Sequence, residues 1–521
     1  MRSGRTILGF LVLVIWVGMV GWQIRREYFQ PELTRLLAAT VNLAPGTNFY
    51  TIQMDGRAVG LATSRLDTIP TGFLLDDLLS LELQALGQPG GAVMRTQVQL
   101  SPALQMERFS FSLDSEGGRF SAEGTVTGDT LLQVTLDAGG GVQNVTHRLT
   151  EAPIFSSVLP IRVAMGEQLT VGARYRYPIF DPTTLSTRTV EVEVMEEARL
   201  PVVDSAFLDE DSRRWLPASV DTVDAWRLQE SYGGMQIESW VDSYGRIVRS
   251  ASAMGFTMER TEFELAQQAQ NEDGEMPFTP SSDVIFQTAI QSNRDLGEVE
   301  SHPELRFLLS GVDLDGFDLD GQRQELRGDT LIVRREIWNE LTPGYQLPYP
   351  RMDLREALVP EPLIQSDDPR ILAAAQSAAG FRRRGGGDPR EVAVRLSDWV
   401  YRALDKNVVF SIPSALQVLE SRGGDCNEHT VLYVAMARAL GLPARTAVGL
   451  VYLNGDFFYH AWPEVWLGEW VAVDPTFGQA PADAAHLRFV TGGLAQQVEI
   501  IRLIGNLNIE VLDMDEGVVG S

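Results

Sequence analysis

The chain has 521 residues, a formal net charge of −27 and a sequence pI near 4.6. Such an acidic chain is a poor partner for nucleic acid or for an anionic membrane surface, and its length predicts about three domains. It contains one cysteine, which excludes an intramolecular disulfide and leaves the redox compartment open.

Residues 7–22 form an almost wholly apolar segment with arginines on both sides. Its length is near the lower limit of about 17–20 residues for a membrane span. No clear small-residue cleavage site follows, so the sequence predicts an uncleaved transmembrane anchor at residues 1–27, with a buried core helix as the alternative. Arginines on both sides make the positive-inside rule ambiguous. The long acidic region that follows favours a single pass through the cytoplasmic membrane with the rest of the chain in the periplasm.

Residues 28–275 show the patterns of strands and turns. Residues 48–54 and 58–62 alternate between apolar and polar side chains, and an Asp-Gly pair between them predicts a hairpin. Similar alternation recurs at residues 109–113, 120–126, 131–136, 189–194 and 235–240. This pattern predicts a large curved antiparallel sheet. A structural or substrate-presenting role is the favoured interpretation, with a hydrophobic ligand on the concave face as the alternative.

Residues 276–350 are predicted to form a second, smaller β-rich domain. Carboxylates cluster at residues 313–321, and such clusters suit a calcium ion. The spacing differs from that of an EF-hand, because the fifth position counted from Asp313 is Phe317. An acidic hairpin turn is therefore favoured over a calcium site.

Two helix starts follow a proline-rich strap. Asp368-Pro369 and Asp388-Pro389 each place an aspartate at the N-cap and a proline at the first helical position. Apolar residues in the second segment predict a helix from residue 389 to about residue 405.

Cys426, the only cysteine, lies in the run RGGDCNEH at residues 422–429. An apolar-rich stretch of good helix formers follows and ends at Gly441 and Pro443. Cys426 is therefore predicted in the first turn of a helix, where unpaired N–H groups and the helix dipole favour a thiolate. A buried structural cysteine is the alternative. His429, one turn later, is interpreted as a structural member of this helix.

Two segments downstream carry the partners that a catalytic thiol requires. His460 lies in YHAWPEVW and Asp474 in WVAVDPT, and the apolar alternation around each predicts a strand. Gly468-Glu469 between them predicts a hairpin turn. A base and a carboxylate on neighbouring strands can face the helix of the thiol, which is the geometry of nucleophilic thiol catalysis.

Four motifs in this order resemble the core of the transglutaminase-like superfamily. They are Gly-Asp-Cys-x-x-His, the helix end GLPAR, His-Ala-Trp and Asp-Pro-Thr. The chain is similar here to the bacterial transglutaminase-like cysteine protease branch, over about residues 365–480. The resemblance implies a papain-like site with Cys426 as nucleophile, His460 as base and Asp474 as the orienting carboxylate. The family's oxyanion side chain upstream of the cysteine cannot be placed in this sequence.

The whole sequence is thus predicted to have an α+β fold. An N-terminal membrane helix and large antiparallel β-rich regions precede a papain-like core at residues 351–521, in which helices pack on an antiparallel sheet. The predicted function is a membrane-anchored envelope enzyme that acts on peptide or protein amide bonds through an acyl-enzyme. Hydrolysis is favoured over cross-linking, and a non-catalytic binding or scaffold protein is the alternative. No cofactor or metal ion is expected, and nothing in the sequence predicts the oligomeric state.

Overall fold

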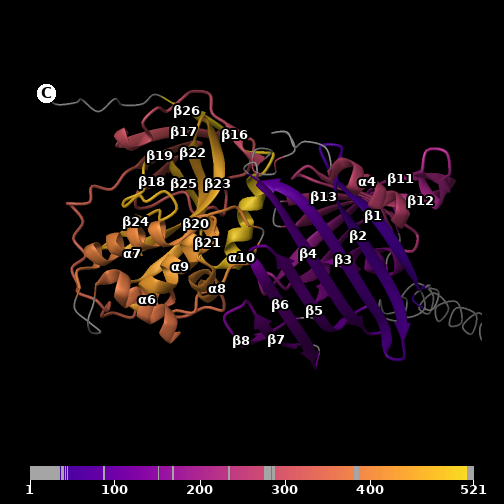
Figure 1. Ribbon diagram of the computed structural model, residues 1–521, viewed down its shortest axis with the longest axis horizontal. Helices are drawn as coiled ribbons and strands as arrows, with labels where there is room; N and C mark the ends of the chain where they lie inside the picture. Colours follow the sequence, from indigo (N-terminus) through magenta and orange to yellow (C-terminus); the bar gives the residue numbers. More distant parts are fainter. Residues whose placement is uncertain are drawn as a thin grey trace, which may run out of the picture.

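The structure is a computed structural model that describes residues 45–512 together with residues 36, 40 and 43. Within that range it leaves out residues 86–87, 129, 151, 167–168, 233–234, 275–282, 284, 286–287, 381–386 and 410. A broad sheet occupies one side of the molecule, and a mixed half with most of the helices lies beside it (Figure 1).

The broad sheet joins 15 strands of the described chain. Those of the first part are β1 (Gly46–Met54), β2 (Arg57–Ile69), β3 (Gly72–Ala85), β4 (Gln88–Leu100), β5 (Met106–Ser115), β6 (Gly118–Thr127), β7 (Leu131–Asp137) and β8 (Val142–Arg148). Those of the second part are β9 (Ile154–Phe155), β10 (Arg174–Asp181), β11 (Ser186–Asp209), β12 (Arg214–Tyr232), β13 (Met235–Asp242), β14 (Ile247–Ser252) and β15 (Phe256–Thr261). Strands adjacent in the chain are paired, and β1 pairs with β15 to join the two runs into one sheet.

Sequential pairing follows from the tight turns between strands. Asp55 and Gly56 have φ values of 52° and 73° and connect β1 to β2, which confirms the predicted Asp-Gly hairpin. Within β5, alternate side chains such as Phe109, Phe111 and Leu113 are buried. The period of two therefore directs one face of the sheet into a hydrophobic core.

A short cover packs against that core. It consists of η1 (Ser156–Val158) and α3 (Leu159–Gly166). Val158, Leu159 and Val163 of this cover are buried in the same hydrophobic cluster as Phe109 of β5. Phe109 also contacts Phe155 of β9 and Phe180 of β10, with ring centroids 5.7 and 5.3 Å apart. Helix α4 (Phe263–Gly274) follows β15 and packs on β1, β2 and β12.

The mixed half contains a sheet in the order β16-β23-β22-β25, with β24 paired to β23. Its strands are β16 (Ile290–Gln291), β22 (Ala444–Leu453), β23 (Asp456–Trp466), β24 (Trp470–Ala472) and β25 (His486–Thr491). Its helices are α6 (Pro369–Ala379), α7 (Pro389–Ala403), α8 (Ala415–Ser421), α9 (Cys426–Ala439) and α10 (Leu494–Gln497), followed by η5 (Val498–Leu503). Buried residues of α6, α7, α8 and α9 share a hydrophobic core with β23 and β24.

The predicted starts of α6 and α7 are confirmed. The side chains of Asp368 and Asp388 accept hydrogen bonds from the N–H groups of Arg370 and Arg390. Each aspartate thereby satisfies a backbone donor that the first helical turn leaves unpaired.

A smaller sheet has the order β18-β19-β17-β26. Its strands are β17 (Glu304–Ser310), β18 (Gln324–Arg327), β19 (Thr330–Arg334) and β26 (Asn508–Val511). The short helical turns η3 (Val299–Ser301) and η4 (Arg355–Ala357) lie outside it. Phe307 of β17 packs edge-on against Phe457 of β23, with centroids 5.8 Å apart, so the small sheet and the mixed half share a core.

The two halves are joined through α8. Ser414 Oγ, at its N-cap, donates to the carbonyl of Ala138 at 2.7 Å, and Gln417 Nε2 donates to the carbonyl of Gly117 at 2.6 Å. Both carbonyls belong to turns of the broad sheet. Because α8 immediately precedes α9, these bonds fix the segment that leads to Cys426.

The predicted α+β fold class is wrong for the chain as a whole. Strands account for 49% and helices for 19% of the structure, and the 15-stranded sheet dominates the part of the chain that is described. The helical patterns after residue 365 were distinctive, whereas the length of strands such as β11, with 24 residues, could not be inferred from short alternating segments. In the described residues we find no helix with the length and apolar character needed to cross a bilayer. The predicted anchor at residues 1–27 lies outside them.

Candidate active site

The first turn of α9 is built by the residues around Cys426. Asp425 is its N-cap and accepts a hydrogen bond from the N–H of Asn427 at 2.8 Å, while the Glu428 side chain accepts from the N–H of Asp425 at 2.9 Å. This reciprocal pair is a capping box. Gly424 has a φ of 148°, and a Cβ there would lie 2.2 Å from Cγ of Glu428. Glycine is therefore required for the glutamate to fold back over the helix start.

Helix α9 is attached to the strand that carries His460. Thr430 Oγ1 donates to the carbonyl of Ala461 at 3.1 Å, and the backbone of Ala461 hydrogen-bonds the Cys426 thiol. Cys426 as a residue is half-buried, but its thiol group is enclosed by protein. The thiol thus lies against the backbone of the residue that follows His460.

The expectation that the helix start favours a thiolate is wrong for the resting protein. Burial raises the pKa of Cys426 well above its ordinary value, and the charge of Asp425 raises it further, whereas the Ala461 hydrogen bond acts in the opposite direction. Burial and the neighbouring Glu428 also raise the pKa of Asp425. Burial and the neighbouring carboxylates therefore favour the neutral thiol of Cys426 over its thiolate.

His460 and Asp474 are brought together as predicted. The hairpin turn at residues 467–469 returns the chain from β23 to β24, and His460 Nε2 lies 2.7 Å from Asp474 Oδ2. An Nε2–H that donates to this carboxylate leaves Nδ1 as the ring atom able to take a proton. Gly449 lies opposite His460 on β22, and a Cβ there would come within 1.9 Å of the Leu487 carbonyl. The close packing of these strands therefore depends on glycine.

Aromatic rings hold the His460 imidazole in place. Phe477 stacks on it with a centroid distance of 4.9 Å and an interplanar angle of 19°, and Trp462 stacks at 6.0 Å. Trp462 is fully buried and Phe477 is 36% exposed. The imidazole thus packs against one ring in the core and one ring near the surface.

Asp474 is fully buried and accepts four hydrogen bonds. Its Oδ1 accepts from the N–H groups of Thr476 and Phe477, and its Oδ2 accepts from His460 and His486. Burial alone would raise the pKa of this carboxyl, but attraction to His460 and the bonds from both histidines hold it well below its usual range. Asp474 is therefore a fixed anion.

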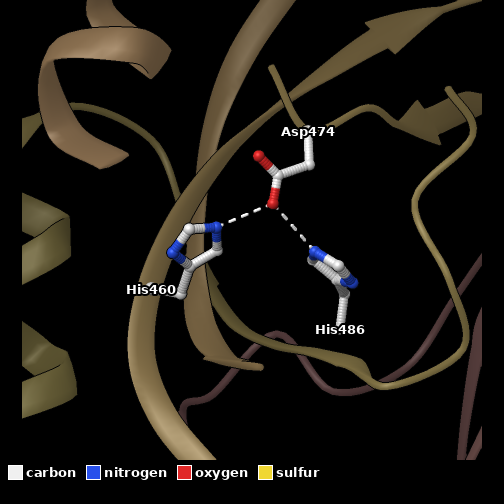
Figure 2. Close-up of side chains that lie close together, drawn as sticks. All are labelled: His460, Asp474 and His486. Atoms are coloured by element: carbon white, nitrogen blue, oxygen red, sulfur yellow. Dashed lines mark hydrogen bonds and ion pairs between the residues drawn. The ribbon is translucent and has the colours of Figure 1, made fainter. Parts of the chain in front are cut away.

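His486 is a member of the cluster that the sequence analysis missed. Its Nε2 lies 3.0 Å from Asp474 Oδ2, and its Nδ1 lies 2.9 Å from Asp483 Oδ1, so one carboxylate oxygen faces two imidazoles (Figure 2). Burial acts to lower the pKa of His486, but Asp483 and the two hydrogen bonds raise it to about 9. The same partnership lowers the pKa of Asp483 despite burial. His486 is thus an imidazolium between two carboxylates.

Ligand atoms of His460, Asp474 and His486 lie within 4.8 Å of one another, a separation compatible with a metal ion. The hydrogen bonding argues for a different use of these atoms. Both imidazoles direct their Nε2 atoms at the same Asp474 oxygen, and a protonated His486 has no lone pair to offer a cation. We therefore interpret the cluster as a hydrogen-bonded chain.

His429 is separate from this chain. It is fully buried, and its Nδ1 lies 2.7 Å from the carbonyl of Asp425. Burial lowers its pKa, so the ring is neutral. Its bond supports the first turn of α9, in keeping with the structural interpretation of this residue.

A cavity of about 420 Å³ lies between the two halves, beside the first turn of α9. Asn427, adjacent to Cys426, forms part of its wall, as do Thr446 of β22 and His147 of β8. Thr446 is 4% exposed, and its Oγ1 has no hydrogen-bond partner among the described residues. The broad sheet thus contributes to a space that adjoins the start of the Cys426 helix.

Residues 377–475 match the model of the transglutaminase-like superfamily. This segment is a transglutaminase-like domain. It contains Cys426, His460 and Asp474, whereas His486 lies beyond its end. The match confirms the predicted resemblance and supports a cysteine enzyme of this kind.

Solved structures similar to the chain come from several bacteria. A candidate cysteine protease from Cytophaga hutchinsonii shares 17% identity over 41% of this chain and 84% of its own, with a TM-score of 0.27. A β-barrel-like protein from Brucella abortus shares 13% identity over 42% of this chain and 95% of its own, with a TM-score of 0.29. A candidate protease from Parabacteroides distasonis shares 10% identity over 71% of this chain and 69% of its own, with a TM-score of 0.19. These scores are too low to carry a conclusion, and no curated protein matches the chain.

Proposed function

We propose that the transglutaminase-like domain cleaves amide bonds of peptides or proteins, with Cys426 as nucleophile, His460 as base and Asp474 as the orienting carboxylate. The observation that carries the proposal is the bond between His460 Nε2 and Asp474 Oδ2 at 2.7 Å. This bond fixes one tautomer of the His460 imidazole. His460 lies on β23, the strand to which the Cys426 helix is hydrogen-bonded.

The neutral thiol determines the first step. His460 Nδ1 takes the proton from Cys426 as the sulfur attacks the substrate carbonyl, so the thiolate forms only during the reaction. The carbonyl oxygen becomes an oxyanion that the N–H of Cys426 at the helix start can stabilise. The C–N bond then breaks, His460 returns the proton to the departing amine, and a thioester remains. Water hydrolyses the thioester and regenerates the thiol.

We propose that His486 is a positioning residue. It does not reach the substrate in this scheme, but its Nε2–H and that of His460 share Asp474 Oδ2. A cation held between Asp474 and Asp483 keeps the carboxylate ionised and correctly oriented towards His460.

We propose that substrate enters the cavity between the two halves, because its wall includes Asn427 next to the nucleophile. Hydrolysis is the favoured outcome, since it requires only that water reach the thioester, whereas cross-linking requires a second groove for an amine acceptor. The broad sheet would then present the substrate to the catalytic half.

The proposal is tested with casein and a fluorescent primary amine. We expect the wild-type protein to release new amino groups faster than it incorporates the label. His460→Ala should lower the rate by roughly a thousandfold or more, and Asp474→Asn should leave a small residual rate. Cys426→Ser should be inactive, and His429→Ala should have a mild effect.

Two results would contradict these assignments. If His429→Ala were as damaging as His460→Ala with the fold intact, the base would be wrong. If amine incorporation exceeded the release of amino groups, the preference for hydrolysis would be wrong.

We also propose that residues 30–521 act on the periplasmic side of the cytoplasmic membrane. The support is the arginine-flanked apolar segment at residues 7–22 and the long acidic region after it. A reporter fused after Ser521 should signal from the periplasm. Protection of the chain from protease added to spheroplasts would reverse this topology.

A further inference from the structure

A second cavity, of about 660 Å³, lies in the half of the molecule that has no catalytic residue. Its floor is the broad sheet, from β1 to β5 and from β14 to β15, and its cover is the η1–α3 segment together with the turn at residues 244–246. The volume is within the roughly 300–1,000 Å³ of small-molecule sites. The cavity is therefore large enough for a ligand rather than for isolated waters.

Most of the wall is apolar. Leu66, Leu75, Met94, Phe111 and Phe155 line it from the sheet and its cover. All but Met94 belong to the buried core of the sheet. A hydrocarbon chain in this space would be removed from water on several sides at once.

Two carboxyl groups interrupt the apolar wall, those of Asp77 and Asp181, and Asp181 already accepts hydrogen bonds from the N–H and hydroxyl of Thr183. Asp77 of β3 lines the cavity, and both of its carboxylate oxygens are buried without a hydrogen-bond partner among the described residues. The hydroxyls of Ser64 and Ser157 lie close enough to moderate its pKa, but burial dominates and raises it to about 6. At neutral pH Asp77 is thus a buried anion, which costs free energy unless a donor or cation pairs with it.

Two arginines beside the cavity are already engaged. Arg246, which also lines the cavity, and Arg260 both donate to Asp242, at 2.7 and 3.0 Å. The preceding residue, Asp76, is directed to the other face of the strand, where Arg95 donates to it at 2.8 Å. The chain therefore supplies cations to Asp242 and Asp76, while Asp77 is left facing an apolar cavity.

We propose that this cavity binds an amphiphile with a single alkyl chain and a positively charged, hydrogen-donating head, whose chain lies along the apolar wall and whose head pairs with Asp77. A carboxylate head would be repelled at this position, and a hydroxyl head would leave the charge of Asp77 uncompensated. This inference goes beyond the proposed enzyme activity and does not depend on it.

The test uses the full-length protein loaded with the neutral fluorescent probe phenylnaphthylamine. Dodecylamine, dodecanol and dodecanoic acid are compared as competitors at pH 7.5, below their micellar concentrations. We expect dodecylamine to displace the probe at a concentration about tenfold or more below that of the other two, the size of effect expected for a charge-assisted hydrogen bond. This advantage should shrink at pH 5, where Asp77 is mostly protonated.

Two substitutions at neighbouring positions separate the buried carboxyl from charge in general. Asp77→Asn should remove the advantage of dodecylamine, whereas Asp76→Asn, on the opposite face of β3, should preserve it. Ala62→Phe, which fills the cavity from β2, should weaken all three competitors. Equal displacement by the three head groups in the wild-type protein would overturn the proposal. So would the same response in the Asp76 and Asp77 variants.

Discussion

The ionisation of Cys426 can be followed directly, because no other cysteine competes for a thiol reagent. Burial and Asp425 raise the pKa of the thiol, so less thiolate is present at any given pH than in an ordinary cysteine. We expect iodoacetamide to label the folded protein more slowly than the urea-unfolded protein at pH 8, with the folded rate still rising above pH 9. Labelling of the folded protein that saturates below pH 8 would mean that the thiolate is stable at rest.

His486 predicts a pH dependence of stability. Its pKa is about 9 in the folded protein, above the ordinary histidine value of about 6.5. A raised folded pKa contributes stability that is fully present below about pH 6.5 and is lost as the pH rises through about 9. We expect a loss of up to about 3 kcal/mol in the free energy of unfolding across this window.

The control for that prediction is His486→Gln, measured by urea unfolding at a series of pH values. This variant lacks the titrating ring, so its stability should be lower near pH 6.5 and nearly constant up to pH 9. The activities of His486→Gln and Asp474→Asn should be measured over the same pH series. A positioning role for His486 requires the pH–rate profile of His486→Gln to change as well. A variant that lost stability but retained the wild-type pH–rate profile would show a purely structural role.

The sequence revealed the residues that lie in recognisable motifs, but not a residue that only forms hydrogen bonds to them. Cys426, His460 and Asp474 lie in recognisable local patterns, and the structure brings His460 and Asp474 into contact. His486 has no such pattern, because its partners are one carboxylate three residues away and another on a different segment. The acidity of Cys426 was also mispredicted, because burial of a thiol depends on tertiary packing.

At the scale of elements, the start of α9 gives a sharp prediction. Gly424→Ala would place a Cβ 2.2 Å from Cγ of Glu428 at a φ of 148°, and would therefore disrupt the capping box. We expect a loss of about 1–3 kcal/mol in the free energy of unfolding, together with loss of activity, because Cys426 lies in this turn.

Gly423→Ala is the matched control. The nearest atom to a Cβ at this position is 3.6 Å away, which is an ordinary contact. Thermal unfolding and amide cleavage should both be close to wild type in this variant. If both alanine variants behaved alike, the contact with Glu428 would not be the reason for glycine at position 424.

Helix starts and hairpin turns could be predicted because their signals are local. The aspartate caps at 368 and 388, the helix start at Cys426 and the turn at residues 55–56 are confirmed. The order of strands was not predictable in the same way. Alternation with a period of two assigns a face to each side chain but does not identify the partner strand, so the pairing of β1 with β15 had no signature in the sequence.

At the scale of the whole molecule, the small sheet depends on the last strand of the described chain. Strand β26 pairs with β17, and Ile509 and Val511 are 5% and 1% exposed. We expect a chain ending at residue 507 to be less stable by about 2–5 kcal/mol and more prone to aggregate, because buried aliphatic side chains are lost and the edge of β17 is exposed. Thermal unfolding and size-exclusion chromatography would measure both effects.

A chain ending at residue 512 retains β26 and is the control. It should match the full-length protein in both measurements. If the chain ending at residue 507 were equally stable, β26 would be peripheral to the fold. Neither truncation removes a residue of the proposed catalytic site. A change in activity would therefore mean that packing of the small sheet stabilises β23, which carries His460.

The fold class was mispredicted at this scale because the helices occupy a limited part of the chain. Helices α6 to α9 lie between residues 369 and 439, whereas the broad sheet extends from β1 to β15. The bonds from Ser414 and Gln417 to turns of that sheet also had no local signal. They connect residues about 280–300 positions apart, a separation at which sequence patterns give no information on contact.

The two long-range strand pairs also have a consequence for biosynthesis. Residues 49–54 pair with residues 256–261, and residues 307–310 pair with residues 508–511. In each case the second strand leaves the ribosome about 200 residues after the first, a delay of roughly 10–40 s at about 5–20 residues per second. During that delay β1 and β17 present unpaired edges to other nascent chains. The protein is therefore most vulnerable to misassembly during translation, when a chaperone that shields strand edges would protect it most.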